Sequence, residues 1–168
     1  YETCAILYNK TYLEEFAQKQ MQAEIDQAAG EASQAEAEAG NVEAQLDLGY
    51  MDLYGVNGAN IDYKQALHYY KLAADNGNAI ALNNLGSLHF NGIGTEVNYA
   101  KAIEFFKAAS DLGSDDASVN LAIIYLGDTD SGKTPNTYEE VFQLLEKAKN
   151  NSISKYLLGY SYYVGFWV

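Results

Sequence analysis

The chain has 168 residues, of which 48% are hydrophobic, so it is long enough and apolar enough to bury the core of one ordinary domain. Its formal net charge of −13 disfavours binding to nucleic acid and to anionic lipid, and it favours basic partners. The single cysteine excludes an internal disulfide, and no run of about 18 apolar residues is present that could cross a membrane.

The first 40 residues differ in composition from the rest of the chain. Residues 11–39 are rich in Ala, Glu and Gln, which are strong helix formers, and residues 35–41 look like the end of a helix and a turn. We interpret residues 1–40 as an N-terminal helical cap or a degenerate repeat, with a partly frayed, solvated helix as the alternative. The sequence starts at Tyr1 without a methionine, which fits a protein whose targeting segment has been removed. A location in the bacterial periplasm, outside the cell or in the cytoplasm is compatible with this sequence.

Beyond residue 40 the sequence repeats with a period of 36 or 37 residues. Each copy contains a leucine followed by glycine or alanine, with a small residue four positions before the leucine. Apolar or small residues at i, i+4, i+5 and i+8 form one face of a helix, so each unit is predicted to begin with a helix, here called the A helix. The leucines and the small residues before them are Leu48 with Ala44, Leu85 with Ala81, Leu121 with Ala117 and Leu158 with Ser154.

A second helix, here called the B helix, is predicted to follow in each unit, because apolar residues recur there in steps of three and four. Asp62 and Asn98 are expected to cap its N-terminus, and Gly77 and Gly113 to end it in a left-handed conformation. Pairs of antiparallel helices bury their apolar faces only by stacking, so the pattern predicts an all-α solenoid. The B-helix positions are Tyr63, Ala66, Tyr69, Tyr70 and Ala73, then Tyr99, Ala102, Phe105, Phe106 and Ala109, and finally Tyr138, Val141, Leu144, Leu145 and Ala148.

The repeated pattern resembles the Sel-one-like repeat, a branch of the tetratricopeptide-like helical repeats. Its elements are A-x-x-x-L-G-x-x-[Y/H], a glycine turn, and D/N-Y-x-x-A-x-x-[Y/F]-[Y/F]-K-x-A-x-x-x-G. The resemblance covers units 41–77, 78–113 and 114–150 and a partial unit 151–168. Departures are Asp52 at an aromatic position and a third unit that lacks the glycine turn and the closing glycine.

The resemblance implies a right-handed α/α superhelical solenoid of stacked antiparallel helix pairs, and a repeat without catalytic residues. Proteins of this family usually serve as adaptors or scaffolds, and many bacterial members are exported. The chain stops inside the A helix of the fourth unit with an apolar end, so we expect either that more repeats follow or that this end packs on a partner.

One segment, Gly127–Thr134, matches the phosphate-binding pattern G-x-x-x-x-G-K-[S/T]. Asp128 and Asp130 place negative charge where phosphates would lie, and residues 119–126 are in register with the other A helices, so a helix rather than a strand should precede the segment. We interpret it as a longer connector, with a nucleotide-binding enzyme as the less favoured alternative.

No other motif predicts chemistry. The same connector lacks the third acidic position and the distal glutamate of a calcium loop. His68 and His89 lie in different helices with no cysteine nearby, and His89 occupies the aromatic position of its repeat. We therefore predict no catalytic residue, no cofactor and no metal site, and we do not expect an enzyme.

The resemblance also implies that the A helices line a concave surface, on which the positions between the core residues face a ligand. These positions are apolar and aromatic, as protein interfaces often are, and the acidic surroundings favour a basic or neutral partner protein or peptide. The alternative is an inhibitor or immunity-type protein that blocks one enzyme in a one-to-one complex. The predicted partner-binding residues are Glu43, Leu46, Tyr50, Leu53, Tyr54, Ile80, Asn83, Ser87, Phe90, Asp116, Val119, Ile123, Leu126, Ile153, Tyr156, Tyr160 and Tyr163.

Overall fold

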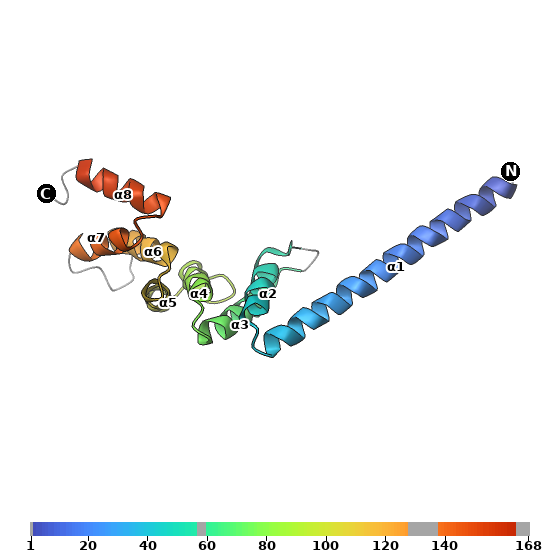
Figure 1. The fold of residues 1–168 in the computed structure, drawn as a ribbon, viewed down its shortest axis with the longest axis horizontal. Coiled ribbons are helices and arrows are strands. Elements are labelled where there is room, and N and C mark those ends of the chain that lie inside the picture. The colour runs from blue at the N-terminus through green and yellow to red at the C-terminus, as the bar shows by residue number, and fades with distance from the viewer. Residues whose placement is uncertain (1, 57–59, 128–137, 164–168) are drawn as a thin grey trace.

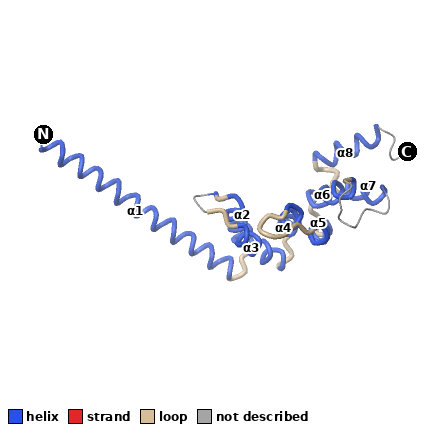
Figure 2. Tube along the Cα trace, turned by 180° about the vertical axis from the view of Figure 1, so that it is seen from behind, coloured by secondary structure: helices blue, strands red, loops and turns tan. Residues whose placement is uncertain are grey.

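The structure is a computed structural model that describes residues 2–56, 60–127 and 138–163. Over these residues it consists of helices and the turns that join them, without a strand (Figures 1 and 2). The predicted all-α solenoid is confirmed. The helices are α1 (Glu2–Glu38), α2 (Val42–Tyr54), α3 (Tyr63–Asp75), α4 (Ala79–Asn91), α5 (Tyr99–Asp111), α6 (Asp115–Leu126), α7 (Tyr138–Lys147) and α8 (Ser152–Tyr163).

Helices α2 to α7 form three stacked pairs, and α8 adds the A helix of the partial fourth unit. Helices α2, α4, α6 and α8 are the A helices, and α3, α5 and α7 are the B helices. Successive elements pack on each other along the chain, and Figure 1 shows that the helical pairs form an arc. In Figure 1, α2 and α4 lie on the upper, inner side of this arc, and α3 and α5 lie on its lower, outer side.

The ends of the helices follow the capping chemistry of the sequence. The Asp62 carboxylate accepts hydrogen bonds from the backbone N–H groups of Lys64 and Gln65 at 3.0 and 3.1 Å, which satisfies two donors that the first turn of α3 leaves without a partner. Asn98 does the same for α5 through Lys101 N–H at 3.0 Å. Gly77 and Gly113 have φ values of 76° and 91°, as predicted for residues that end a helix.

The glycine that follows the repeat leucine lets an A helix approach the aromatic ring of its B helix. A Cβ placed on Gly86 would lie 2.7 Å from two ring carbons of Phe106, and one on Gly49 would lie 2.8 Å from the ring of Tyr70. In the third unit the corresponding residues are Ala122 and Leu145, both fully buried. Where alanine replaces the glycine of the A helix, leucine therefore replaces the aromatic residue of the B helix. The exchange keeps the packing dense.

Residues 2–38 form one continuous helix, α1, so this segment is not a degenerate pair of helices. Every described side chain from residue 15 to 36 is exposed, and Ala37 in the last turn is buried against α2. Over residues 17–36 the Ala, Glu and Gln composition favours a helix but provides no wide apolar stripe, so this described part of α1 has little with which to bury a second helix. Figure 1 shows α1 extending away from the arc. Its role as a cap remains a prediction.

The junction of α1 and α2 contains a buried polar side chain, Gln45. Its Nε2 donates to the carbonyl oxygen of Ala37 at 2.8 Å, and its Oε1 makes no hydrogen bond to the described residues. The Ala37 carbonyl also accepts from Gly40 N–H at 3.1 Å, so it stays paired without Gln45.

We expect Gln45→Met to raise the free energy of unfolding by about 1 kcal/mol, because it removes a buried acceptor without a partner and keeps the side-chain length. Urea denaturation of wild type and variant measures the difference. Gln65→Met, at an exposed position of α3, is the control and should change little. A loss of stability in Gln45→Met would show that the Ala37 bond outweighs the desolvated oxygen.

None of the described helices combines the length and the apolar character that spanning a bilayer requires. Residues 128–137 and 164–168, which include most of the Gly127–Thr134 connector and the apolar C-terminal residues, lie outside the described part of the chain.

Candidate protein-binding surface

The predicted partner-binding residues all lie on the four A helices, and most of them are accessible to solvent. The half-buried members are Leu46, Leu53, Asn83, Ser87 and Phe90. The exposed members are Glu43, Tyr50, Tyr54, Ile80, Asp116, Ile123, Leu126, Ile153, Tyr156, Tyr160 and Tyr163.

Val119 is the exception, because only 2% of it is exposed, and its prediction as a ligand-facing residue is wrong. The equivalent residue of the second unit, Asn83, points at the next A helix, where it accepts a hydrogen bond from Asn120 Nδ2 at 3.0 Å. This repeat position therefore lies at the seam between successive A helices, and the short valine side chain is enclosed there.

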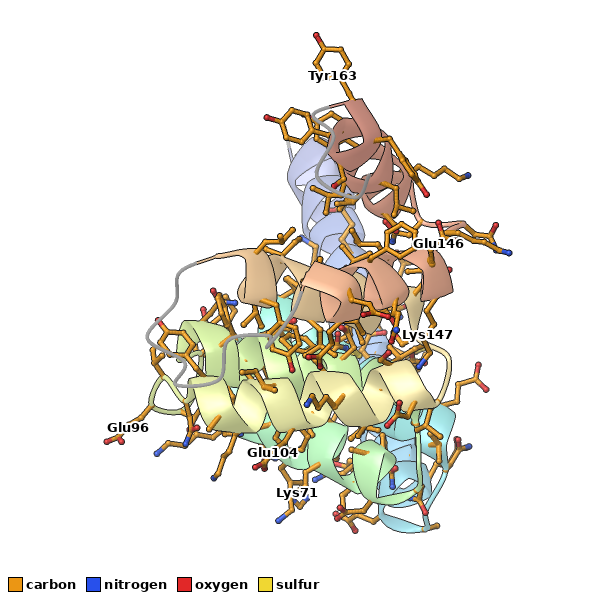
Figure 3. The ribbon with its side chains drawn as sticks, turned by 90° about the vertical axis from the view of Figure 1, so that its left-hand side faces the viewer. Lys71, Glu96, Glu104, Glu146, Lys147 and Tyr163 are labelled. Atoms are coloured by element: carbon orange, nitrogen blue, oxygen red, sulfur yellow. The ribbon has the colours of Figure 1, made fainter. Side chains whose placement is uncertain are left out.

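Tyrosine rings are concentrated at the two ends of this surface. The rings of Tyr50 and Tyr54 on α2 lie 4.6 Å apart between centroids, and those of Tyr156 and Tyr160 on α8 are stacked at 6.5 Å with an angle of 17°. Tyr156 is 69% exposed and Tyr163 is 88% exposed, and Figure 3 shows Tyr163 projecting from the far end of α8. These rings do not contribute to the core, so they leave a large apolar area on the surface.

Asparagine side chains join successive A helices across the surface. Besides the bond between Asn120 and Asn83, Asn151 Nδ2 donates to a carboxylate oxygen of Asp116 at 2.8 Å, which ties the start of α8 to α6. Asn120 and Asn151 were not among the residues predicted from the sequence. The only available signal was the cap position of Asn151, whose Oδ1 accepts from Ile153 N–H at 2.9 Å.

Lysines are unevenly distributed between the helices. Three of the A helices, α2, α4 and α6, carry no lysine or arginine, whereas Lys155 lies on α8 and lysines occur on all three B helices. Burial, and then the nearby Asp62, raises the pKa of the Asp52 carboxyl above its usual value. The charged side chains of α2, α4 and α6 are Glu43, Asp47, Asp52, Asp115 and Asp116.

His89 packs as an aromatic residue. Its ring is stacked on Phe105 at 5.5 Å between centroids, and burial, followed by the charge of Lys101, lowers its pKa. This position agrees with the prediction that His89 fills the aromatic position of its repeat. In the described part of the chain, no three His, Cys, Asp or Glu side chains are grouped so that they could hold a metal ion.

A hollow of about 230 Å³ opens between α4 and α6. Phe106 and Ile124, which are buried, form its base, and the remaining lining residues are more accessible. Of the lining residues, Ser87, Phe90 and Ile123 were predicted from the sequence as partner-binding residues, whereas Asn91 and Asn120 were not. A second hollow, of about 270 Å³, lies where α1 meets α2, and Glu36, Glu43 and Asp47 are among its lining residues.

The segment that precedes the Gly127–Thr134 connector is helical, as predicted. Helix α6 extends to Leu126, whereas a phosphate-binding loop of the nucleotide-hydrolase type follows a strand. This arrangement removes the structural context on which the nucleotide-binding alternative depends.

Comparison with known proteins identifies a family repeat in part of the chain. Residues 42–78 and 79–114 each match the family model of the Sel1 repeat. No curated protein matches the sequence. Among solved structures, the chain is similar to c5321, a protective antigen present in uropathogenic Escherichia coli strains that displays an SLR fold, with 30% identity over 82% of this chain and a TM-score of 0.73. It is also similar to a Sel1 repeat protein from Oxalobacter formigenes, with 27% identity over 76% of this chain and a TM-score of 0.68. The chain spans 29% and 51% of these two proteins.

Proposed function

We propose that the chain, in which two segments match the Sel1 repeat, is a scaffold that binds a partner protein or peptide on the face formed by its A helices. Sel1 repeats generally mediate protein–protein interactions, and their fold is typically a non-enzymatic binding scaffold. The two solved structures described above are from bacteria, which supports a bacterial origin for this chain as well.

The observation that carries the proposal is the row of apolar and aromatic side chains that the A helices expose. Tyr50, Ile123 and Tyr160 occupy the same position in the first, third and fourth units, and each is about half exposed or more. Repeat positions that belong to the core are buried instead, as Leu85 and Leu121 show. Tyrosine provides a large contact area at a low entropic cost and keeps a hydroxyl for hydrogen bonding, as protein interfaces require.

Charge supports a basic or neutral partner. The carboxylates of α2 and α6 have no lysine on α2, α4 or α6 to neutralise them. A partner with lysine or arginine would be attracted over a distance of about 10 Å at moderate salt, which raises its association rate more than its affinity.

We expect Tyr50→Ala and Tyr160→Ala each to weaken partner binding roughly tenfold, because an aromatic anchor is lost, while helix content stays nearly constant. A partner isolated by pull-down from the native source and identified by mass spectrometry is titrated against each variant, and circular dichroism follows the fold. Tyr63→Ala is the control, because Tyr63 is an exposed tyrosine on the B helix α3.

Two outcomes would contradict the proposal. If both variants unfold, these tyrosines are core residues. If both bind the partner as tightly as wild type and Tyr63→Ala binds more weakly, the A-helix face is not the binding surface.

A further inference from the structure

The hollow between α4 and α6 arises from a difference between the repeats. Two residues after the repeat leucine, the first, third and fourth units have Tyr50, Ile123 and Tyr160, but the second unit has Ser87. Ser87 is half-buried and lines the hollow, and its side chain is much smaller than the tyrosine or isoleucine at this position in the other units. In the described part of the chain, this hollow therefore lies beside the one unit that has serine at this position.

The walls of this hollow are held in place by the surrounding structure. The Phe90 ring contacts Tyr99 of α5 at 5.2 Å between centroids, and Asn91 Nδ2 donates to the carbonyl oxygen of Ser87 at 2.9 Å. Asn120 is held by its bond to Asn83. A preformed site of this kind loses little conformational entropy when a ligand binds.

The lining defines the chemistry of an occupant. Buried Phe106 and Ile124 make the base apolar, while Asn91 and Asn120 lie among the more accessible lining residues. The Oδ1 atoms of both asparagines make no hydrogen bond to the described residues, so both can accept one from a ligand. A volume of about 230 Å³ is below the range of roughly 300–1,000 Å³ that small-molecule sites occupy, and it suits one side chain.

We propose that this hollow holds a single apolar side chain of an extended segment of the partner protein, with lysine or arginine residues flanking that side chain. The backbone N–H groups beside the apolar residue donate to Asn91 Oδ1 and Asn120 Oδ1. The flanking cations lie near the carboxylates of the same face, of which Asp116 is one helical turn before Asn120 on α6. This proposal rests on the proposed function and specifies the recognition at its centre.

Filling the hollow tests the proposal. Ser87→Tyr introduces at this position the residue that two other units already have, so the variant is compatible with the repeat, and circular dichroism checks its fold. Glu104→Tyr is the matched control, because it adds the same side chain to an exposed position of the B helix α5 (Figure 3). The probe is a phage library of random dodecapeptides selected on the immobilised wild-type chain.

The enriched peptides are expected to share one leucine, isoleucine, methionine or phenylalanine next to lysine or arginine. They should bind wild type and Glu104→Tyr equally and bind Ser87→Tyr roughly tenfold more weakly or worse. Replacing the shared apolar residue of such a peptide by aspartate should cause a similar loss on wild type.

The remaining outcomes overturn the inference. Enriched peptides that bind Ser87→Tyr as well as wild type, or that share acidic residues, show that the hollow is not the anchor site. If such peptides still bind Tyr50→Ala or Tyr160→Ala more weakly than they bind wild type, the proposed function stands and only this inference fails. If no peptide is enriched and the native partner also binds independently of both tyrosines, the proposed function fails too.

Discussion

Gly86→Ala is expected to lower the free energy of unfolding by about 1–3 kcal/mol, although alanine favours a helix over glycine by about 1 kcal/mol. The added Cβ would lie 2.7 Å from two ring carbons of Phe106, too close for ordinary contact. Phe106 is only 2% exposed, so relieving this contact requires its buried ring to shift against the core or toward the hollow that it lines. Denaturation by urea, followed by circular dichroism, measures the loss.

The matched control for this substitution is Gly159→Ala. Gly159 holds the same place after the leucine of its unit, but a Cβ there would meet nothing within 4 Å. This variant should therefore be neutral or more stable by up to about 1 kcal/mol. Equal destabilisation by both substitutions would show that close contact with the ring is not the reason for the glycine.

A double substitution tests the same contact from the other side. The third unit combines Ala122 with Leu145 where the second unit combines Gly86 with Phe106. Phe106→Leu should make room for the new methyl group, so the double variant should lose less stability than the two single variants together, by about 0.5 kcal/mol or more. Strict additivity would contradict direct contact between the two side chains.

Stability is expected to decrease by up to about 3 kcal/mol between pH 10 and pH 12 because of Tyr70 alone. Burial, and to a lesser degree the nearby Tyr54, raises the pKa of Tyr70 from 10.0 to about 12, although a hydrogen bond with Asn84 acts in the opposite direction. In this pH range the unfolded chain loses the phenolic proton while the folded chain keeps it. The unfolded state therefore binds fewer protons, and the free energy of unfolding decreases as the pH rises.

Urea denaturation at pH 9 and at pH 11.5 measures this effect as a difference from Tyr70→Phe. The variant lacks the hydroxyl, so it should lose less stability over the same interval, whereas other groups titrate alike in both proteins. Below pH 10 the free energy of unfolding of the variant should differ from that of wild type by a constant amount of roughly 1 kcal/mol. This difference reflects the lost hydrogen bond to Asn84. Parallel pH profiles throughout would show that Tyr70 ionises as freely in the folded chain as in the unfolded one.

Much of the solenoid could be predicted because it depends on local contacts. Ala81, Leu85 and Phe106 are buried as the repeat required, and Asp62 and Asn98 cap the helices that they precede. Each of these roles follows from residue type and spacing within one helical pair, since neighbouring units contact only each other.

The surface was predicted less completely, because its details depend on how neighbouring units meet. Val119 was expected to face a ligand but is enclosed, and Asn120 was missed although it bonds to Asn83 across 37 positions. Neither outcome can be derived from one unit alone, because the register between two A helices decides which side chain lies at the seam.

The sequence by itself determined the helices, their caps, the period of the stack and the residues that fill its core, because these follow from periodic apolar spacing and from hydrogen bonds between close neighbours. The tertiary structure alone decided that residues 2–38 form a single projecting helix, that Val119 is buried, and that Ser87 leaves a hollow between α4 and α6. The physical reason is that a cavity or a seam is defined by the distance between side chains of different units, and a linear pattern does not contain that distance.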